Sequence, residues 1–407
     1  MKNKKDIIII GAGASGIFAA INTAKNNPNL NILILEKTSK NLSKVKISGG
    51  GRCNVTHACF EPKELIKFYP RGGRELLGTF YNFNPTNTIE WFKERGVQLK
   101  TEHDGRMFPT TDNSQTIIDC FLAEIDKYNI TIQYQSTLTK IEPIEDGFDL
   151  TINEQKIACN KLLIASGGIN KIGQGKLLSD LGHSIIEPAP SLFTFNLPKH
   201  SILQLQGVVS DVEIKILGSK FIEQGPLLIT HWGVSGPAVL KLSSWGAKHL
   251  QEKNYEFDFM VNWLPNIKND EILKAQFQQN KQEFGSKKIV NQFDVDIPKK
   301  LKLYLLEKSG IHLDLKWAEI SKKQLNKLIE NLMRDIYPSK GKTTFKNEFV
   351  SCGGIKLKEV NFKTMESKLV PNLYFSGEVL NVDAVTGGFN FQAAWSTAFI
   401  AAQSMAE

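Results

Sequence analysis

The chain has 407 residues, more than one hydrophobic core usually serves, so we expect two or three domains. A hydrophobic fraction of 41% and a charged fraction of 23% are ordinary for a soluble globular protein. No stretch approaches the roughly 18 consecutive apolar residues of a membrane-spanning helix, so we expect no membrane partner.

The formal charge of +8 is concentrated in one part of the chain. Residues 268–346 carry 17 Lys and Arg against 10 Asp and Glu, a net charge of +7. Such a segment can mark a polyanionic partner such as RNA, but lysine-rich helices that simply face solvent have the same composition. Charge alone leaves both interpretations open.

The cysteines argue against a disulfide framework and against a structural zinc site, because they are odd in number, scattered, and include no CxxC pair. We therefore predict a reducing compartment and no metal site. Residues 1–16 imitate a signal peptide, but only four isoleucines precede the first glycine, which favours a strand. We expect a cytoplasmic protein. The cysteines are Cys53, Cys59, Cys120, Cys159 and Cys352.

The first predicted elements form a β-α-β unit of about thirty residues. Residues 6–10 are a run of aspartate and isoleucine without a polar face, which is typical of a parallel strand covered on both sides. A helix follows the glycines, and residues 31–36 form the next apolar strand. This pattern predicts the start of a doubly wound α/β sheet. The apolar face of the helix comprises Ile17, Ala20, Ile21 and Ala24.

The remaining elements suggest insertions into the first domain. Alternating runs at 208–217 and 255–261 predict an antiparallel sheet or small barrel, and the pattern is helical from about 270 to 337. The tail at 371–402 returns to strand, glycine turn and helix. Other predicted elements are a helix at 114–128, strands at 131–135, 137–143, 147–153 and 161–168, a crossing at 188–198, and a capping box at 321–324 with an apolar stripe of Leu325, Leu328, Ile329 and Leu332.

The motif GAGASG at residues 11–16 has the GxGxxG spacing of dinucleotide-binding turns. Gly11 permits the tight turn, Gly13 allows a pyrophosphate to approach the backbone, and Gly16 allows close helix–strand packing. Glu36 lies twenty residues after Gly16, where it can accept hydrogen bonds from an adenosine ribose. Together these features predict a dinucleotide site.

Two later glycine turns favour FAD over NAD as the tightly held cofactor. The stretch IASGG at 164–168 resembles a turn of two-dinucleotide-fold flavoproteins, and residues 374–394 resemble the last FAD motif of that class. There Glu378 would lie near the ribityl chain. A helix beginning near Gly387 or Gly388 would direct its positive end at the flavin pyrimidine and stabilise negative charge on the reduced ring.

The loop KISGGGRCNVTHAC at 46–59 allows three readings: a redox-active cysteine pair, a metal loop, or a backbone loop against the cofactor. Flavin disulfide reductases have four residues between their thiols, whereas Cys53 and Cys59 have five. One extra helical residue rotates the second thiol by about 100°, and the chain lacks a second nucleotide-binding unit. Consecutive glycines instead allow a flat ring or an anion to approach the main chain. We predict that this loop wraps FAD.

The predicted cofactor contacts come from these turns and from the strand that follows residue 137. They are Gly11, Ala12, Gly13, Ala14, Ser15, Gly16, Glu36, Lys37, Lys46, Ser48, Gly49, Gly50, Gly51, Arg52, Cys53, Asn54, Leu138, Ala165, Ser166, Gly167, Gly168, Gly377, Glu378, Asp383, Gly387, Gly388, Phe389, Asn390 and Phe391.

Six stretches form a recognisable set: GAGASG at 11–16, KVKISGGGRCNVTH at 44–57, GRMFP at 105–109, LLIASGG at 162–168, LLITHWGVSGPAVLKLS at 227–243, and residues 364–396. The set resembles the BaiN/RdsA family of NAD(P)/FAD-dependent oxidoreductases, which is related to aminoacetone oxidase-type flavoproteins. The resemblance implies an α/β, two-dinucleotide-binding-type (Rossmann-like) FAD domain, discontinuous over 1–190 and 345–407. It also implies an inserted β-barrel-like domain at 191–267 and a basic helical domain at 268–344.

The activity implied by the resemblance is reduction of FAD by NAD(P)H, followed by reduction of an activated C=C bond. The substrate would be an enone-like small molecule or a uridine of ribosomal RNA, which would become dihydrouridine. Two alternatives remain: an oxidase of a small amine or aminoketone with O2 as acceptor, and an RNA-binding protein with structural FAD. Lysines that could contact RNA phosphates are Lys287, Lys288, Lys299, Lys300, Lys302, Lys322, Lys323 and Lys327.

Reduction of a C=C bond also needs a proton donor. Candidates are Cys53, His57 and His231, although each also fits an ordinary role as a packing, loop or strand-end residue. Arg106 could hold an anionic substrate or form a structural ion pair. The sequence does not choose between these roles.

Overall fold

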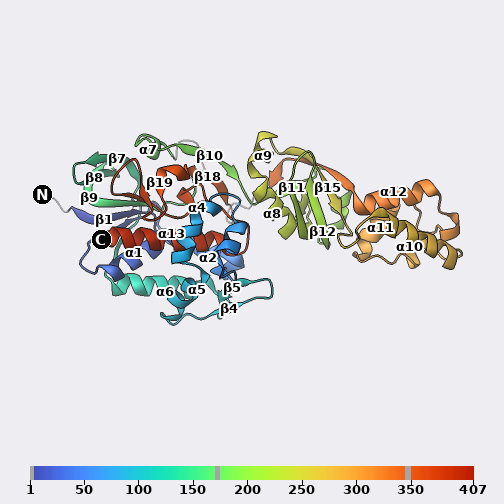
Figure 1. Ribbon diagram of the computed structural model, residues 1–407, viewed down its shortest axis with the longest axis horizontal. Helices are drawn as coiled ribbons and strands as arrows, with labels where there is room; N and C mark the ends of the chain where they lie inside the picture. Colours follow the sequence, from blue (N-terminus) through green and yellow to red (C-terminus); the bar gives the residue numbers. More distant parts are fainter. Residues whose placement is uncertain (1–3, 170–174, 344–349) are drawn as a thin grey trace. The chain divides into compact units, whose positions relative to one another are not determined.

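The computed structural model describes residues 4–169, 175–343 and 350–407. These residues form two compact units, one of Met1–Pro190 with Lys346–Glu407 and the other of Ser191–Phe345 (Figure 1). The first unit is therefore built from both ends of the chain. The expected three-way division, with a boundary after residue 267, stays a prediction.

The first unit is organised around a parallel sheet whose central strand is β1(Lys5–Ile10). It pairs in parallel with β2(Ile32–Leu35) on one side and with β9(Gln155–Ile164) on the other. β6(Thr131–Gln133) lies beyond β2, and β21(Leu373–Phe375) lies beyond β9. The central isoleucines of β1 are fully buried, because the sheet is covered on both faces.

Antiparallel strands complete this mixed sheet of nine strands. They are β7(Leu138–Ile144) and β8(Gly147–Ile152) beside β9, and β19(Val360–Asn361) and β20(Glu366–Ser367) beside β21. The smaller sheets are β3(Thr56–His57), β5(Arg106–Pro109) and β4(Leu99–Thr101), and β10(Ile185–Pro190) with β18(Ser351–Ile355).

In the first unit, α1(Ala14–Asn26) lies against α13(Phe389–Ala406) (Figure 1). The predicted apolar face of α1 is buried, and so is every residue from Ser15 to Ala24. Phe18 contributes to an aromatic cluster, with its ring centroid 4.8 Å from that of Trp91 and 5.3 Å from that of Trp395. The remaining α-helices are α2(Ser43–Gly51), α3(Pro62–Leu65), α4(Gly73–Asn82), α5(Pro85–Lys93), α6(Ser114–Lys127) and α7(Lys176–Ser179).

The second unit contains a seven-stranded antiparallel sheet, formed by strands that precede and follow its helices α10–α12 (residues 270–333) in the chain. Its order is β16(Asp335–Lys340), β15(Glu256–Asn262), β12(Val209–Ile216), β13(Ile222–Ile229), β14(Gly233–Ser235), β11(Thr194–Asn196) and β17(Lys342–Thr343). The helix α8(Pro237–Trp245) packs against β13 and is followed by α9(Ala247–Glu252). The alternating burial of β12 agrees with a sheet that has one covered face.

Three helices complete the second unit: α10(Asp270–Glu283), α11(Lys299–Lys308) and α12(Lys322–Met333). The predicted capping box at the start of α12 is confirmed, since Ser321 and Gln324 bond reciprocally to each other's backbone amides. The predicted apolar stripe faces the core: Leu328, Ile329 and Leu332 are buried, and Leu325 packs at its margin.

Asp335 at the start of β16 joins the sheet of the second unit to α11. Its side chain is 2% exposed and accepts hydrogen bonds from Trp263 Nε1 (3.2 Å) and from the Tyr337 hydroxyl. Lys308, in the last turn of α11, forms an ion pair with the same carboxylate. Three donors therefore depend on one buried acceptor.

We expect Asp335→Ala to lower the free energy of unfolding by about 3 kcal/mol, because it leaves Lys308 and two buried donors without their acceptor. The control is Asp314→Ala, which removes the exposed ion pair with Lys288 and should cost less than about 1 kcal/mol. Urea unfolding monitored by tryptophan fluorescence measures both. An equal decrease in the free energy of unfolding in the two variants would show that the buried Asp335 carboxylate stabilises the unit no more than an exposed ion pair does.

Candidate functional site

The GAGASG turn connects β1 to α1 and leaves an open face in front of the helix. A Cβ on Gly11 (φ +109°) would lie 2.5 Å from the Ala165 carbonyl oxygen, and one on Gly16 would lie 2.0 Å from that of Gly11. A Cβ on Gly13 would meet no atom of the described residues within 4 Å. Two glycines thus permit backbone packing, and the third leaves room for a ligand.

The N-terminus of α1 is suited to an anion. No side chain of the described residues caps it, and its first turn contains no acid. Its first amides point out of the helix with the positive end of the dipole. The predicted contact Ser15 is directed elsewhere, because its hydroxyl donates to Ser376 Oγ (2.6 Å). Ala12 and Ala14 offer only backbone to a ligand.

Glu36 lies directly after β2 and is held in a fixed orientation. Its Oε2 accepts a hydrogen bond from the Ala12 amide (2.9 Å), and its Oε1 accepts from the amide and the hydroxyl of Thr38 (both 2.8 Å). Oε1 thus accepts two hydrogen bonds, whereas Oε2 accepts one and has a second lone pair available for a ribose hydroxyl.

A cavity of about 230 Å³ lies where β1, β2 and β9 end. It is smaller than the roughly 300–1,000 Å³ of typical small-molecule sites, so it fits one end of a dinucleotide. Its lining includes six predicted contacts: Gly11, Glu36, Lys37, Leu138, Ser166 and Gly168. It also includes Ile10, Leu35, Ser136, Thr137, Ile141, Ile164, Ile169, Leu177 and Leu178, which the motifs did not identify. The position of Ser136 and Thr137 just after a parallel strand is the signal that could have found them.

The glycine turn after β9 borders this cavity. The Ala165 amide donates to the Ile10 carbonyl (2.9 Å), which places the turn beside the end of β1. Gly167 has φ +77°, and a Cβ there would meet no described atom within 4 Å. Like Gly13, this glycine leaves its outer face open.

The last residues of α2, from Ser48 onward, leave helical geometry and form a glycine-rich loop with a backbone suited to an anion or a flat ring. Gly49, Gly50 and Gly51 have φ values of +57°, +69° and +85°, which disfavour any residue with a side chain. Added Cβ atoms on Gly50 and Gly51 would meet no described atom within 4 Å. The Ser48 hydroxyl donates to the Val45 carbonyl (2.9 Å).

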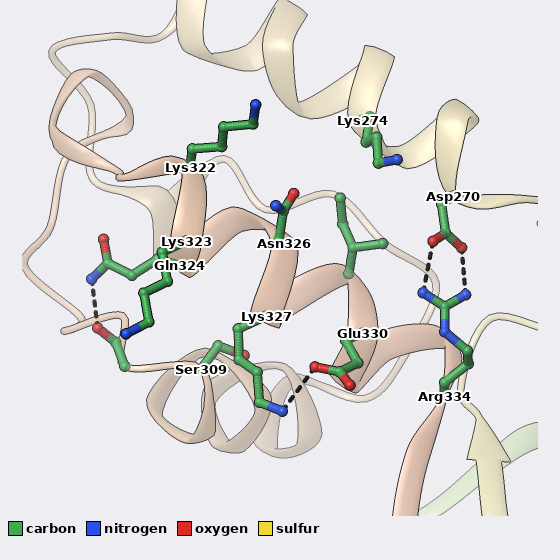
Figure 2. Close-up of a pocket in the computed structure, with 12 residues that line it drawn as sticks. Asp270, Lys274, Ser309, Lys322, Lys323, Gln324, Asn326, Lys327, Glu330 and Arg334 are labelled. Carbon is green, nitrogen blue, oxygen red and sulfur yellow. Dashed lines mark hydrogen bonds and ion pairs between the residues drawn. The ribbon is translucent and has the colours of Figure 1, made fainter.

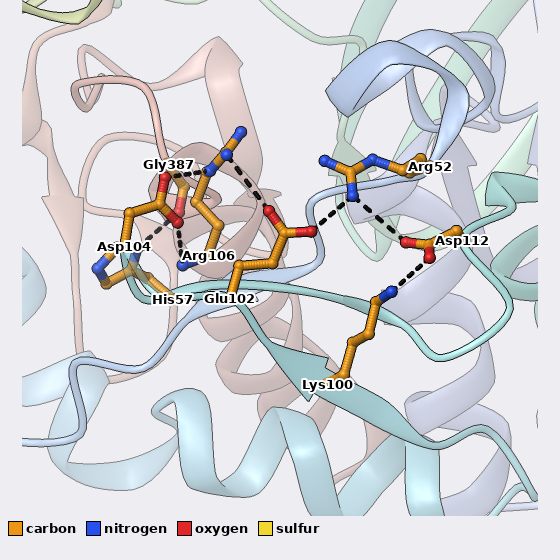
Figure 3. A network of polar contacts seen from close by, with 8 residues as sticks. All are labelled: Arg52, His57, Lys100, Glu102, Asp104, Arg106, Asp112 and Gly387. Atoms are coloured by element: carbon orange, nitrogen blue, oxygen red, sulfur yellow. Dashed lines mark hydrogen bonds and ion pairs between the residues drawn. The ribbon is translucent and has the colours of Figure 1, made fainter. Parts of the chain in front are cut away.

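The charged residues of this loop differ in their surroundings (Figure 3). Arg52 forms ion pairs with Glu102 (2.6 Å) and Asp112 (3.3 Å), and its guanidinium lies 3.9 Å from the centre of the Phe108 ring. Lys46 is exposed. The loop's cationic contribution to an anion would therefore come from Lys46 more readily than from Arg52, whose guanidinium is already shared by two carboxylates.

Asn54 connects the loop to the start of α13. In the amide orientation that satisfies both of its polar atoms, its oxygen accepts from the Gly388 amide (3.0 Å) and its nitrogen donates to the Thr56 carbonyl (3.0 Å). A Cβ on Gly388 (φ +92°) would lie 2.5 Å from the Thr56 carbonyl oxygen. The two glycine-rich segments therefore approach at backbone distance.

The turn before α13 is held from several sides. His57 Nδ1 lies 3.0 Å from the Gly387 carbonyl oxygen, and the His57 ring stacks on Phe389 at 4.4 Å. Asn390 bonds with both polar atoms of its side chain to the backbone of Ala384. Asp383, which is fully buried, pairs with Arg71 through both carboxylate oxygens. The turn is thus preorganised, and no side chain of the described residues caps the helix that it opens.

The other predicted tail residues have protein partners. Glu378 forms an ion pair with Lys44 (2.5 Å), and the Gly377 amide donates to Thr397 Oγ1 (3.0 Å). The Phe391 ring stacks on Trp395 at 5.4 Å. Their cofactor contacts stay predictions.

The three candidate proton donors differ in their surroundings. Cys53 is fully buried, and burial raises the pKa of its thiol to about 12. His57 is held against the α13 turn. His231 belongs to the second unit, where it is exposed and its ring contacts Trp232 at 3.7 Å. Arg106 forms ion pairs with Asp104 (2.7 Å) and Glu102 (3.3 Å) (Figure 3).

All five cysteines, each within the described residues, are free, and burial raises the pKa of Cys59 as well. Within residues 4–169, 175–343 and 350–407, no cluster of three or more His, Cys, Asp or Glu could hold a metal ion. No helix in the same ranges is long and apolar enough to cross a membrane.

Comparisons with known proteins place this site in a family. The family model described as "HI0933-like protein Rossmann domain" matches residues 5–404. The "Ribosomal RNA dihydrouridine synthase" of Escherichia coli (strain K12) is 30% identical over 411 residues, covering 98% of both chains. The "3-dehydro-bile acid delta(4,6)-reductase" of Clostridium scindens is 28% identical, again covering 98% of both.

A solved structure supports the fold alone. The 3-ketosteroid-delta4-(5alpha)-dehydrogenase of Rhodococcus jostii RHA1 aligns with a TM-score of 0.54 at 10% identity, covering 100% of this chain and 97% of that one. The predicted α/β class with a Rossmann-type FAD-binding domain is confirmed, and so is the family resemblance seen in the motifs. The chain belongs to the HI0933-like Rossmann-domain family.

Proposed function

We propose that this oxidoreductase of the FAD-binding Rossmann class takes electrons from NAD(P)H and reduces an activated C=C bond, with a uridine of ribosomal RNA as the leading substrate. The observation that carries the proposal is the cavity at the ends of β1, β2 and β9. There Glu36 is oriented by two backbone amides, and the open face of Gly13 precedes an uncapped helix.

The residues present fit FAD. The pyrophosphate would lie at Gly13 and the first amides of α1, and the adenosine would enter the cavity beside Glu36. The loop with Gly50 and Gly51 and the uncapped start of α13 would take the flavin end, because both offer backbone without side-chain obstruction. When bound, a flavin accepts a hydride from a nicotinamide and passes it to an electron-poor carbon, while a proton is added at the neighbouring carbon.

The chain's own residues would position the flavin end and stabilise its charge. The contacts of Asn54, His57 and Asn390 hold the α13 turn in one conformation, so the helix dipole keeps a fixed direction. His57 would then act as a positioning residue. Buried Cys53 is a poor proton donor, because a thiol with a pKa near 12 yields its proton reluctantly at neutral pH.

The relatives favour reduction and point to RNA. One curated relative is named for dihydrouridine in ribosomal RNA and another for a bile-acid reductase, and both names describe addition of hydrogen to a double bond. The excess of positive charge in residues 268–346 suits the RNA substrate better than a bile acid.

We expect anaerobic stopped-flow mixing with NADPH or NADH to bleach the visible flavin absorbance rapidly, whereas a small amine should leave it unchanged. The reduced protein should then add two hydrogens to a uridine in ribosomal RNA from a strain that lacks the gene, as measured by mass spectrometry of nuclease fragments. Bleaching by the amine would indicate an oxidase. If neither donor bleaches the flavin, a structural cofactor is indicated, and unchanged RNA mass would exclude that substrate.

Gly13→Ala should lower FAD occupancy at least about tenfold, a loss of about 1.4 kcal/mol in binding, because the new Cβ enters the space that a pyrophosphate needs. The backbone of Gly13 (φ −87°, ψ −172°) suits alanine, so the apoprotein should fold normally. Gly78→Ala is the matched control: Gly78 also has free space for a Cβ, but within α4. The measurements are the flavin absorbance per protein and the unfolding temperature of the apoproteins. Full FAD occupancy in Gly13→Ala would contradict the proposal that the pyrophosphate lies at Gly13.

Cys53→Ala should retain full turnover, because the buried thiol, with its pKa raised to about 12, is packing and not chemistry. Alanine tolerates the left-handed backbone at this position (φ +62°) about as well as cysteine does. Cys59→Ala serves as the control. A fall in kcat of about 100-fold or more for Cys53→Ala alone is the size expected for loss of a general acid and would restore Cys53 as the proton donor.

A further inference from the structure

The second unit contains a large open cavity between α10 and α12, with a volume of about 940 Å³ (Figure 2). Five of its lining side chains are cations and two are carboxylates, which leaves three positive charges in excess. Ile329 is the one large apolar side chain among them. The charged lining is Lys274, Lys322, Lys323, Lys327, Arg334, Asp270 and Glu330.

The carboxylates of this region neutralise three of the five cations. Arg334 pairs with Asp270 through two hydrogen bonds of 2.7 and 2.6 Å, and Lys327 pairs with Glu330 at 2.9 Å (Figure 2). Lys274 pairs with Glu271 at 2.8 Å, next to the Asp270 carboxylate. These pairs fix one side of the cavity without supplying net charge.

Lys322 and Lys323 account for the two positive charges that remain after these three pairings. Neither side chain has a hydrogen-bond or ion-pair partner among the described residues, and both are exposed. They stand in the first turn of α12, where the helix dipole disfavours cations. Two uncompensated lysines at an unfavourable position beside a polar hollow are better explained by an anionic ligand than by stability of the helix.

The structure also separates these two lysines from the rest of the basic segment. Lys299 and Lys300 occupy the first turn of α11 and do not line the cavity. Lys288 is paired with Asp314 at 2.5 Å. The positive charge of residues 268–346 is therefore unevenly distributed. Lys322 and Lys323 combine two features: they have no carboxylate partner among the described residues, and they line a cavity.

We propose that this cavity binds backbone phosphates of the RNA substrate through Lys322 and Lys323, an inference that rests on the proposed action on ribosomal RNA. A phosphodiester chain suits a wide polar hollow with flexible, exposed ammonium groups, because lysine contacts phosphate as a point charge without demanding geometry. A bile acid or another steroid-like molecule suits this cavity poorly, because Ile329 is the one large apolar side chain in a lining with five cations.

The test compares K322Q/K323Q with K299Q/K300Q in the flavin-containing full-length protein. Both double variants remove two exposed lysines from the first turn of a helix in the same unit, so their charge change is identical. Binding of a labelled ribosomal RNA fragment is measured by fluorescence anisotropy at several salt concentrations. Flavin bleaching by NADPH and the unfolding temperature are recorded for every protein.

We expect K322Q/K323Q to bind about tenfold or more weakly, and its slope of log K against log salt to be shallower by about 1.4–1.8, the value for two lost phosphate contacts. K299Q/K300Q should stay close to the original protein, and NADPH bleaching should be unchanged in both. Equal weakening in both variants, or none in K322Q/K323Q, overturns the cavity proposal while the reductase function stands. If NADPH bleaches the flavin of the original protein but this protein does not bind the RNA, then RNA is not the substrate. The cavity proposal is then also wrong.

Discussion

The first unit depends on close approaches of backbone at the end of β1. A Cβ added to Gly16 would stand 2.0 Å from the Gly11 carbonyl oxygen, and one added to Gly11 would stand 2.5 Å from the Ala165 carbonyl oxygen. Only glycine permits both contacts. They place the start of α1 directly over the strand ends, so the helix amides, Glu36 and the turn after β9 all border one cavity. Without this packing, the same residues would lie on separate surfaces.

A second set of contacts explains why this unit needs both ends of the chain. Asn54 bonds to Gly388, His57 approaches Gly387, and Arg71 pairs with buried Asp383, although more than 300 residues separate the members of each pair. The residues after the second unit therefore complete the candidate flavin end, and α13 covers α1. The interruption of the first unit is tolerated because its two parts meet through buried, directional bonds and an aromatic cluster, which compensate for the entropy of closing a long loop.

Local spacing predicted the parts of the site that are continuous in sequence. The GxGxxG spacing and the three consecutive glycines are local patterns, so the backbone conformations that depend on glycine could be read directly from the sequence. The cofactor contacts of these residues and of Glu36 stay predictions. The partners of Arg52, Ser15 and Asp383 could not be read in this way, because their carboxylate, hydroxyl and guanidinium partners come from distant segments. α1 was expected to have one apolar face but is buried all round, since the sequence did not indicate that α13 would cover it.

The two candidate ligand sites use positive charge in opposite ways. Around the candidate cofactor site, Lys44, Arg52 and Arg71 each pair with a carboxylate. Attraction for the pyrophosphate of the proposed FAD would therefore fall chiefly to the uncapped amides of α1 and to exposed Lys46. Amides fixed in a helix bind an anion without losing side-chain entropy and at short range, which suits a cofactor that stays bound. Lys322 and Lys323 are flexible and solvent-exposed, so salt screens their attraction. Screened, reversible contacts suit a large substrate that must leave after each turnover, so the proposed RNA contacts would differ in kind from the contacts proposed for the cofactor.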